Sequence, residues 1–120
     1  MTDLYGKEIL DHYRDPSNEG ELEGCFTASV ENPKCGDSTQ VYVNVEDNVI
    51  RDFKHITKGC AICTASASML SEEIVGMNVE EVLDMGEEQM VEVIGFEVPE
   101  RRLKCAILGL EALKKAINKG

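Results

Sequence analysis

The feature that most limits how this chain can fold is a pair of β-strand patterns joined by a short turn. Val41, Val43 and Val45 alternate with other residue types, which is the two-residue period of a strand with one buried face. Residues 46–48 are Glu-Asp-Asn, a composition typical of tight turns. The apolar residues of 49–56 then indicate a returning strand. The sequence therefore predicts a β-hairpin over residues 39–57.

A third strand is predicted before the hairpin. Phe26, Ala28 and Val30 share one face of an extended segment that begins at residue 25. Residues 32–37, with the sequence Asn-Pro-Lys-Cys-Gly-Asp, indicate a loop by their Pro and Gly content. The strand and the hairpin together predict a small antiparallel three-stranded sheet.

Helical patterns occur on both sides of these strands. Asp3 can cap the first helix, and Asn78 with Glu81 has the spacing of a capping box. The predicted helices are residues 3–14, 61–75, 78–86 and 101–118, with one or two further turns over 87–94. This order of elements predicts an α+β fold in which the helices pack on one face of the sheet. The length of 120 residues suits a single domain over residues 1–120.

The charge balance excludes some classes of partner. The formal net charge is −11, whereas a nucleic-acid-binding protein needs a basic face. The longest stretch without charged residues, 59–71, is shorter than the roughly 20 apolar residues that span a bilayer. The N-terminus has no basic region followed by an apolar run, so no secretory signal is predicted. We expect a soluble, cytoplasmic protein that contacts neither nucleic acid nor membrane.

The cysteines indicate metal or sulfur chemistry. Five cysteines in a chain without an export signal are a poor basis for a disulfide framework, and the count is odd. Cys35 and Asp37 flank a glycine in the predicted loop, Cys60 lies at a predicted helix start, and Cys105 lies near basic residues in the first turn of the last helix. If these segments converge, they provide a tetrahedral set of three thiolates and one carboxylate. The alternative, three separate cysteines buried as small hydrophobic residues, stays open at this point.

Four motifs in order resemble a known family. They are Asp-His-Tyr at 11–13, Asn-Pro-Lys-Cys-Gly-Asp at 32–37, Gly-Cys-Ala-Ile-Cys-Thr-Ala-Ser-Ala-Ser-Met at 59–69 and Arg-Leu-Lys-Cys-Ala at 102–106. Taken together, they resemble the U-type iron–sulfur cluster scaffold family, which comprises IscU, the N-terminal domain of NifU, and SufU. The resemblance extends over residues 4–118.

The resemblance implies a function and a ligand set. Such scaffolds assemble a transient [2Fe–2S] cluster from iron and from sulfur supplied by a cysteine desulfurase, and then transfer it to apo-proteins. It implies Cys35, Cys60 and Cys105 as thiolate ligands and Asp37 as a ligand or a gate on exchange. It also implies an iron donor and an electron donor, with a homodimer around the cluster left open. A scaffold of this kind is not an enzyme.

Three departures separate the chain from the family's better-known members. Lys104 stands where IscU proteins usually have a His before the last cysteine, and a protonated Lys cannot bind a metal. This favours Asp37 as the fourth ligand. Lys104 is then an auxiliary residue of the site and not a ligand. Only 44 residues separate Cys60 from Cys105, which leaves no room for the insert of SufU proteins. The Leu-Pro-Pro-Val-Lys chaperone motif of bacterial IscU is also missing.

Alternative interpretations of the site concern zinc and the remaining cysteines. A zinc ion in place of the cluster would make the chain a sulfur acceptor that stimulates a desulfurase, or a small structural zinc domain. Cys35 and Cys105 are the sulfur-acceptor candidates, and Cys35 is favoured because its loop is expected to be mobile. Cys63 forms a Cys-x-x-Cys pair with Cys60 and is either a buried side chain or an auxiliary sulfur acceptor or ligand. Cys25 is interpreted as a packing residue, and neither histidine is a candidate ligand.

Overall fold

The structure is a computed structural model that describes residues 6–32, 36–95 and 98–119. Its sheet has three antiparallel strands, β1 (Phe26–Asn32), β2 (Asp37–Glu46) and β3 (Val49–Lys58), in the order β1-β2-β3. The predicted hairpin over 39–57 is therefore confirmed, and each of its strands is longer than the sequence pattern indicated. Asp47 and Asn48 form its two-residue turn with φ values of 53° and 64°, as the twist of a tight hairpin requires.

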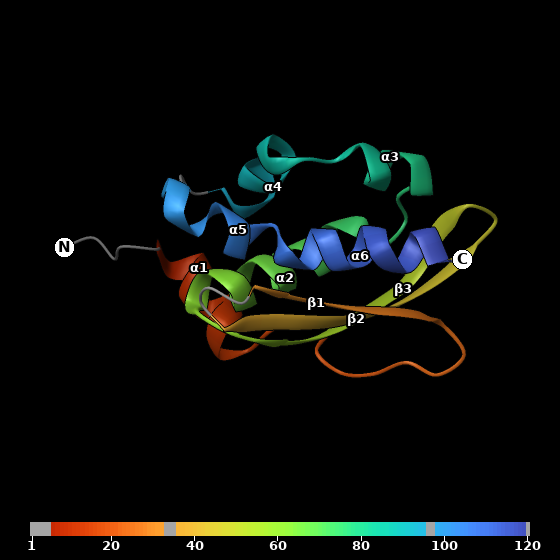
Figure 1. Cartoon of the computed structure of the whole chain (residues 1–120), viewed down its shortest axis with the longest axis horizontal. Coiled ribbons are helices and arrows are strands. Elements are labelled where there is room, and N and C mark those ends of the chain that lie inside the picture. Colours follow the sequence, from red (N-terminus) through yellow and green to blue (C-terminus); the bar gives the residue numbers. More distant parts are fainter. Residues whose placement is uncertain (1–5, 33–35, 96–97, 120) are drawn as a thin grey trace.

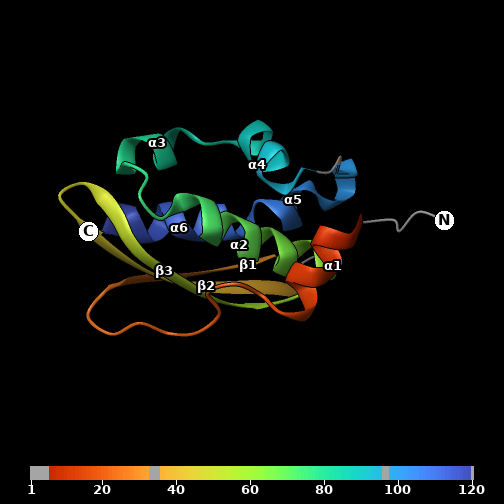
Figure 2. The ribbon, with the colours of Figure 1, turned by 180° about the vertical axis from the view of Figure 1, so that it is seen from behind.

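Helices cover one face of this sheet (Figure 1). They are α1 (Gly6–Arg14), α2 (Ala61–Ile74), α3 (Val79–Asp84), α4 (Glu87–Ile94), a 3-10 turn η1 (Glu100–Arg102), α5 (Leu103–Ala106) and α6 (Leu108–Lys119). Figures 1 and 2 show α2 and α6 next to the sheet and α3 and α4 beyond them, while the segment between α1 and β1 passes the opposite face. The predicted α+β fold, with an antiparallel three-stranded sheet and helices packed on one face, is confirmed.

The core lies between the sheet and the helix layer. The alternating residues Val41 and Val43 of β2 are fully buried there, together with Leu70 of α2 and Leu113 of α6. The small residues of α2 permit a close helix crossing, since a β-carbon on Gly109 of α6 would lie 3.3 Å from that of Ala67. Helix α2 is therefore buried along most of its length, and its first residue is held in a fixed position relative to β2 and β3.

The predicted last helix over residues 101–118 is wrong in one respect, because the structure divides it. Helix α5 ends at Ala106, Ile107 has φ −98° and ψ 0°, and α6 begins at Leu108. The two parts have different neighbours: α5 packs against α2 and α4, whereas α6 packs against α2 and also along β1 and β2. One straight helix cannot satisfy both contacts, so the axis changes at Ile107.

The predicted loop over residues 32–37 is wrong at its two ends. Asn32 and Asp37 form the last residue pair of the β1–β2 ladder, so both belong to strands. The first helix is described only from Gly6, and its predicted cap Asp3 lies outside the described residues. None of the helices in the described part of the chain is long and apolar enough to cross a membrane.

Candidate metal centre

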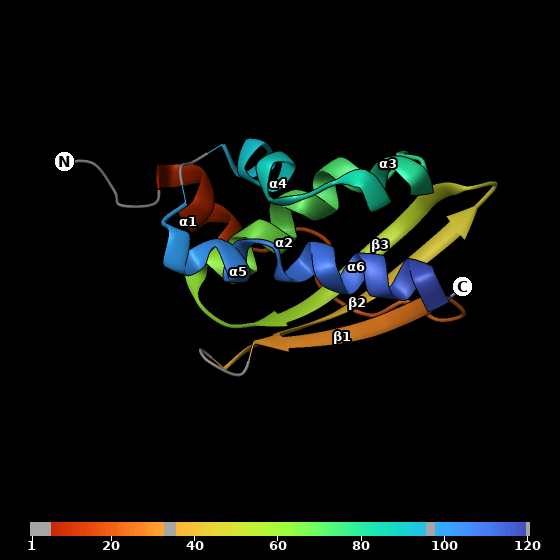
Figure 3. The same ribbon diagram turned by 45° about the horizontal axis from the view of Figure 1, so that its top comes forward.

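Three chain segments that are far apart in sequence meet at one end of the sheet. Asp37 is the first residue of β2, Cys60 is the residue before α2, and Cys105 lies in α5. One ligand atom from each side chain lies within 4.8 Å of the other two. Figure 3 shows the start of β2, the end of β3 and α5 gathered at this end of the molecule. The predicted convergence of these three residues is therefore present in the fold.

Asp37 contacts Cys60 through both carboxylate oxygens. Oδ1 accepts a hydrogen bond of 3.2 Å from the Cys60 backbone N–H, and the Cys60 Sγ lies 3.7 Å from Oδ2. Cys60 occupies the N-cap position of α2, where backbone N–H groups are left without intrahelical partners. The carboxylate of Asp37, which belongs to β2, therefore accepts a hydrogen bond from one of these N–H groups. The helix dipole stabilises a negative group at this end of α2.

Gly59 makes the close approach of Asp37 possible. A β-carbon at position 59 would lie 2.6 Å from Asp37 Oδ1 and 2.7 Å from its Cγ, so any side chain there would force Asp37 to move. Counting along the hairpin from the Ser38–Lys58 pair places Asp37 next to Gly59. The sequence analysis did not identify this role of Gly59, although the register of the predicted hairpin could have revealed it.

Cys105 enters the site from the helix layer. Its side chain is 3% exposed, and Asp37 is 4% exposed, whereas Cys60 is half-buried. Asp37 was predicted in a loop, and its burial follows from its place at the start of β2, where it contacts Cys60 at the N-terminus of α2. Burial of a carboxylate beside two thiols is costly unless the three groups share hydrogen bonds or a cation. The Cys60 N–H supplies one such hydrogen bond.

The other predicted site residues lie elsewhere or beyond the described part. Cys35 lies outside the described residues, so its position relative to the cluster stays a prediction. Lys104 is exposed and lines a shallow pocket together with the acidic residues Glu31, Glu87 and Glu111. Cys63 is buried at 1% exposure one turn after Cys60 and is not among the three clustered ligand residues.

Cys25 and the histidines have structural partners. The Cys25 Sγ–H donates to the Leu22 carbonyl over 3.3 Å, immediately before β1. His55 is fully buried between Thr57 and the Ser17 carbonyl, with a distance of 2.9 Å to each. The His12 Nδ1 lies 2.6 Å from the buried Ser68 Oγ, which ties α1 to α2. Both histidines therefore hold other parts of the fold together through these contacts.

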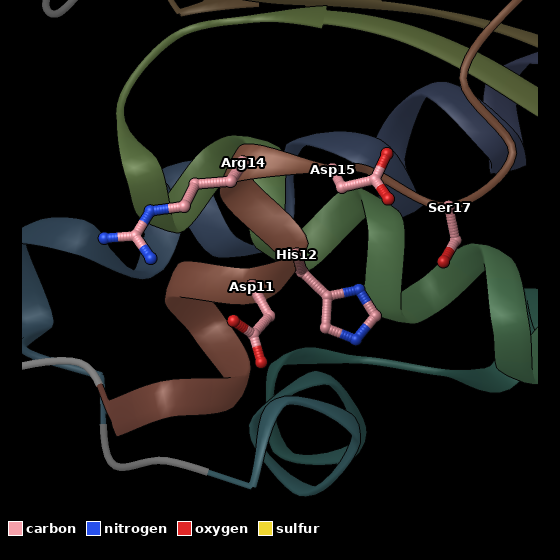
Figure 4. Close-up of a pocket in the computed structure, with 5 residues that line it drawn as sticks. All are labelled: Asp11, His12, Arg14, Asp15 and Ser17. Carbon is pink, nitrogen blue, oxygen red and sulfur yellow. The ribbon is translucent and has the colours of Figure 1, made fainter.

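A polar pocket near His12 is separate from the cluster. Figure 4 shows Asp11, His12 and Arg14 on α1 and Asp15 and Ser17 on the segment that follows. The contact residue of His12 on α2, Ser68, lies more than two helical turns after Cys60. The pocket therefore does not contribute to the grouping of Asp37, Cys60 and Cys105.

The clustered donors suit two kinds of cargo. Two cysteine thiolates are the ligands that iron–sulfur clusters and zinc prefer, and a carboxylate is a harder ligand that iron and zinc also accept. A fourth donor is needed to complete a tetrahedral zinc site or to hold a two-iron cluster. Cys35, which precedes Asp37 by two residues and lies outside the described residues, is the donor that the sequence predicts for this position.

Comparisons with known proteins agree with this site. Residues 4–119 match the family described as the NifU-like N terminal domain. The iron–sulfur cluster assembly scaffold protein IscU 1 of Archaeoglobus fulgidus is 36% identical over 115 residues, covering 95% of this chain and 74% of that protein. The zinc-dependent sulfurtransferase SufU of Bacillus subtilis is 30% identical over 136 aligned positions, covering 99% of this chain and 92% of that protein.

A solved structure supports the fold. The N-terminal NifU-like protein from Brucella abortus superposes with a TM-score of 0.80 at 24% sequence identity, covering 97% of this chain and 93% of that chain. At that identity the likeness shows the fold alone. The three-stranded sheet and the helix layer are therefore an architecture that a NifU-like protein shares.

Proposed function

This chain belongs to the NifU-like N-terminal domain family, and we propose that it is a scaffold on which an iron–sulfur cluster is assembled and then transferred to apo-proteins. The observation that carries the proposal is the grouping of Asp37, Cys60 and Cys105 within 4.8 Å. The IscU relative's name as an assembly scaffold supports the same assignment. Cys35 is proposed as the third thiolate, because the motif it shares with Asp37 resembles the family's first ligand motif.

The donor set supports a transient rather than a permanent cluster. A carboxylate holds the iron of a cluster less firmly than a thiolate does, so one weak ligand eases release. Asp37 also has an alternative partner, the Cys60 N–H, which donates a hydrogen bond to the carboxylate when the metal leaves. We propose a [2Fe–2S] cluster, built from iron and from sulfur of a cysteine desulfurase, as the cargo. On this account the chain holds and hands over a cluster and is not a catalyst.

Sulfur delivery favours the loop before β2. Cys105 is buried at 3% exposure, so a partner's active-site cysteine cannot reach it without a movement of α5. Cys60 is half-buried, and Cys35 lies outside the described residues, in a segment that the sequence predicts to be a loop. We therefore keep Cys35 as the first sulfur acceptor, with Cys105 as the alternative.

Cluster assembly followed by transfer tests the proposal. The protein is purified without oxygen and incubated with iron, cysteine and a cysteine desulfurase. We expect sulfur-to-iron charge-transfer absorption that then moves to an added apo-ferredoxin. A protein that stays colourless, or that keeps all of its cluster in the presence of the acceptor, would contradict the scaffold function.

A second candidate is a zinc-bound sulfur acceptor that stimulates a desulfurase. It is supported by the SufU relative and by the fit of two thiolates and a carboxylate to tetrahedral zinc. The alignment with that relative spans 136 positions, so SufU carries residues that have no counterpart in this 120-residue chain. One tightly bound zinc ion per protein, together with faster desulfurase turnover and no cluster formation, would favour this candidate.

A further inference from the structure

Cys63 lies where the scaffold function leaves it without a role. It is buried at 1% exposure and is not among the three clustered ligand residues. It follows Cys60 by three residues, and the structure holds both as cysteine thiols. The pair therefore contains one half-exposed sulfur at the metal centre and one sulfur shielded from solvent behind it.

The local backbone places this pair at the start of helix α2. Cys60 is the N-cap of α2 and Cys63 is the third residue of the helix, and the Thr64 N–H donates to the Cys60 carbonyl over 3.1 Å. Side chains three residues apart on a helix have β-carbons about 5–6 Å apart. A small adjustment brings two such sulfurs to bonding distance, as in the Cys-x-x-Cys motifs of disulfide oxidoreductases.

Cluster chemistry creates a need for such a dithiol. A desulfurase supplies sulfur as a persulfide, in which the transferred atom is at the oxidation level of elemental sulfur. A cluster contains sulfide, so each sulfur atom must gain two electrons before it can bridge iron. Two thiols that become one disulfide provide two electrons.

We propose that Cys63 is a resolving thiol that releases sulfide from a persulfide carried on Cys60, an inference that rests on the proposed scaffold function. The Cys63 sulfur attacks the Cys60 Sγ, the bond between the two sulfurs of the persulfide breaks, and the outer sulfur leaves as hydrogen sulfide. The Cys60 persulfide and the Cys63 thiol are thereby converted into a Cys60–Cys63 disulfide and one hydrogen sulfide. The thiol protons leave with the sulfide, so atoms, electrons and charge balance.

Burial assigns the order of events. A persulfide sulfur, from a donor in solution or passed on from Cys35, reaches the half-buried Cys60 but not Cys63. Within this pair Cys60 is therefore the cysteine that carries the persulfide, and Cys63 can react only with a group already attached to its neighbour. A Cys60 in a disulfide cannot bind iron. An external dithiol reductant must therefore regenerate both thiols, and the sulfide is released beside Asp37 and Cys105.

A single-turnover assay without other reductants tests the proposal. Reduced protein is desalted without oxygen and treated with one equivalent of glutathione persulfide. Released sulfide is measured, and the thiols are then blocked for peptide mass spectrometry. We expect about one sulfide per protein together with a Cys60–Cys63 disulfide. Cys63→Ala and Cys63→Ser should release sulfide at least tenfold more slowly and retain the persulfide on Cys60.

The controls separate the possible failures. Cys25→Ala removes a cysteine outside the metal centre and should behave as the wild type does. Cys63→Ser keeps nearly the same volume, so it remains informative if Cys63→Ala does not fold. Equal sulfide release from wild type and Cys63→Ser, or a persulfide found on Cys63, would overturn the proposal. Reconstitution with iron and free sulfide bypasses this step, so failure of the wild type there would count against the scaffold function instead.

Discussion

Gly59 and Asp37 lie so close that a β-carbon at position 59 would be 2.6 Å from the Asp37 Oδ1. Gly59 does not have a left-handed backbone conformation, so Gly59→Ala strains the contact with Asp37 rather than the chain itself. We expect the substitution to push the carboxylate away from Cys60 and to weaken metal binding by about tenfold, as loss of an orienting contact commonly does. Titration with Co²⁺, followed by its thiolate charge-transfer absorption, measures this.

Gly86→Ala is the matched control for this effect. Its nearest side-chain atom, Gln89 Oε1, would be 3.5 Å from the new β-carbon, which is an ordinary contact. Gly86 is the N-cap of α4, a different part of the helix layer from the metal centre. Equal cobalt affinity for Gly59→Ala and Gly86→Ala would show that the position of Asp37 does not matter for metal binding.

Asp37→Cys is expected to make the cluster harder to release. The change replaces the one hard oxygen ligand with a thiolate, which iron–sulfur clusters bind more firmly. Loss of cluster absorption to an iron chelator and to apo-ferredoxin should slow by about tenfold or more relative to wild type. Transfer rates that are the same for the two proteins would remove Asp37 from the release mechanism.

His55 makes stability depend on pH. Its burial lowers its pKa below the ordinary value of 6.5, although the hydrogen bond to the Ser17 carbonyl opposes this shift. The unfolded chain therefore binds a proton at a higher pH than the folded chain does. The stabilisation is complete above pH 6.5 and is lost as the pH falls from there towards the lower pKa of the folded state, at up to about 1.4 kcal/mol per pH unit.

Urea unfolding at pH 7.5, 6.5 and 5.5 tests this dependence. His55→Gln should be less stable than wild type at pH 7.5, because a buried hydrogen-bonded group is replaced, but its stability should fall less between pH 6.5 and 5.5. His12→Gln removes the histidine between α1 and α2 and serves as the control. A wild-type slope that persists in His55→Gln would assign the pH dependence to other groups.

The fold was largely predictable because its determinants are local. Alternating valines and an Asp-Asn turn specify the hairpin, and the capping box at Asn78 specifies the start of α3, where the Asn78 N–H donates to Glu81 over 3.2 Å. The break at Ile107 was not predictable. It results from the different neighbours of α5 and α6. Such tertiary contacts cannot be predicted from the spacing of apolar residues along a helix.

The site was predictable in its members but not in its contacts. Motif resemblance indicated Asp37, Cys60 and Cys105 as partners, and their mutual distance confirms that they meet. The burial of Asp37 and its hydrogen bond from the Cys60 N–H depend on β2 beginning at Asp37. The Pro and Gly content of residues 32–37 predicted a loop there, so the start of the strand could not be located from the sequence. Local residue propensities predict that a turn is present, but they do not predict at which residue the following strand begins.

Close packing of α2 on α6 gives a prediction for stability. The ideal β-carbon of Gly109 would lie 3.3 Å from Ala67, so the helix crossing has no space for a larger residue. Ala67→Leu should lower the free energy of unfolding by about 1–3 kcal/mol, the usual cost of overpacking a core. Glu73→Leu, at an exposed position of α2, should change it by less than about 0.5 kcal/mol. Denaturant unfolding measures the stability of both variants. If Ala67→Leu were as stable as wild type, the crossing of α2 and α6 would not be tightly packed.

The most direct test of the central claim is the iron and sulfide content of reconstituted ligand variants. Wild type and Cys25→Ser are expected to bind matched amounts of iron and sulfide, because Cys25 lies outside the grouped ligands. Cys60→Ser and Cys105→Ser should each lose most of the bound iron, sulfide and charge-transfer absorption while remaining folded by circular dichroism. If both folded variants keep a wild-type content of iron and sulfide, the three grouped side chains do not hold the cluster and the account is wrong.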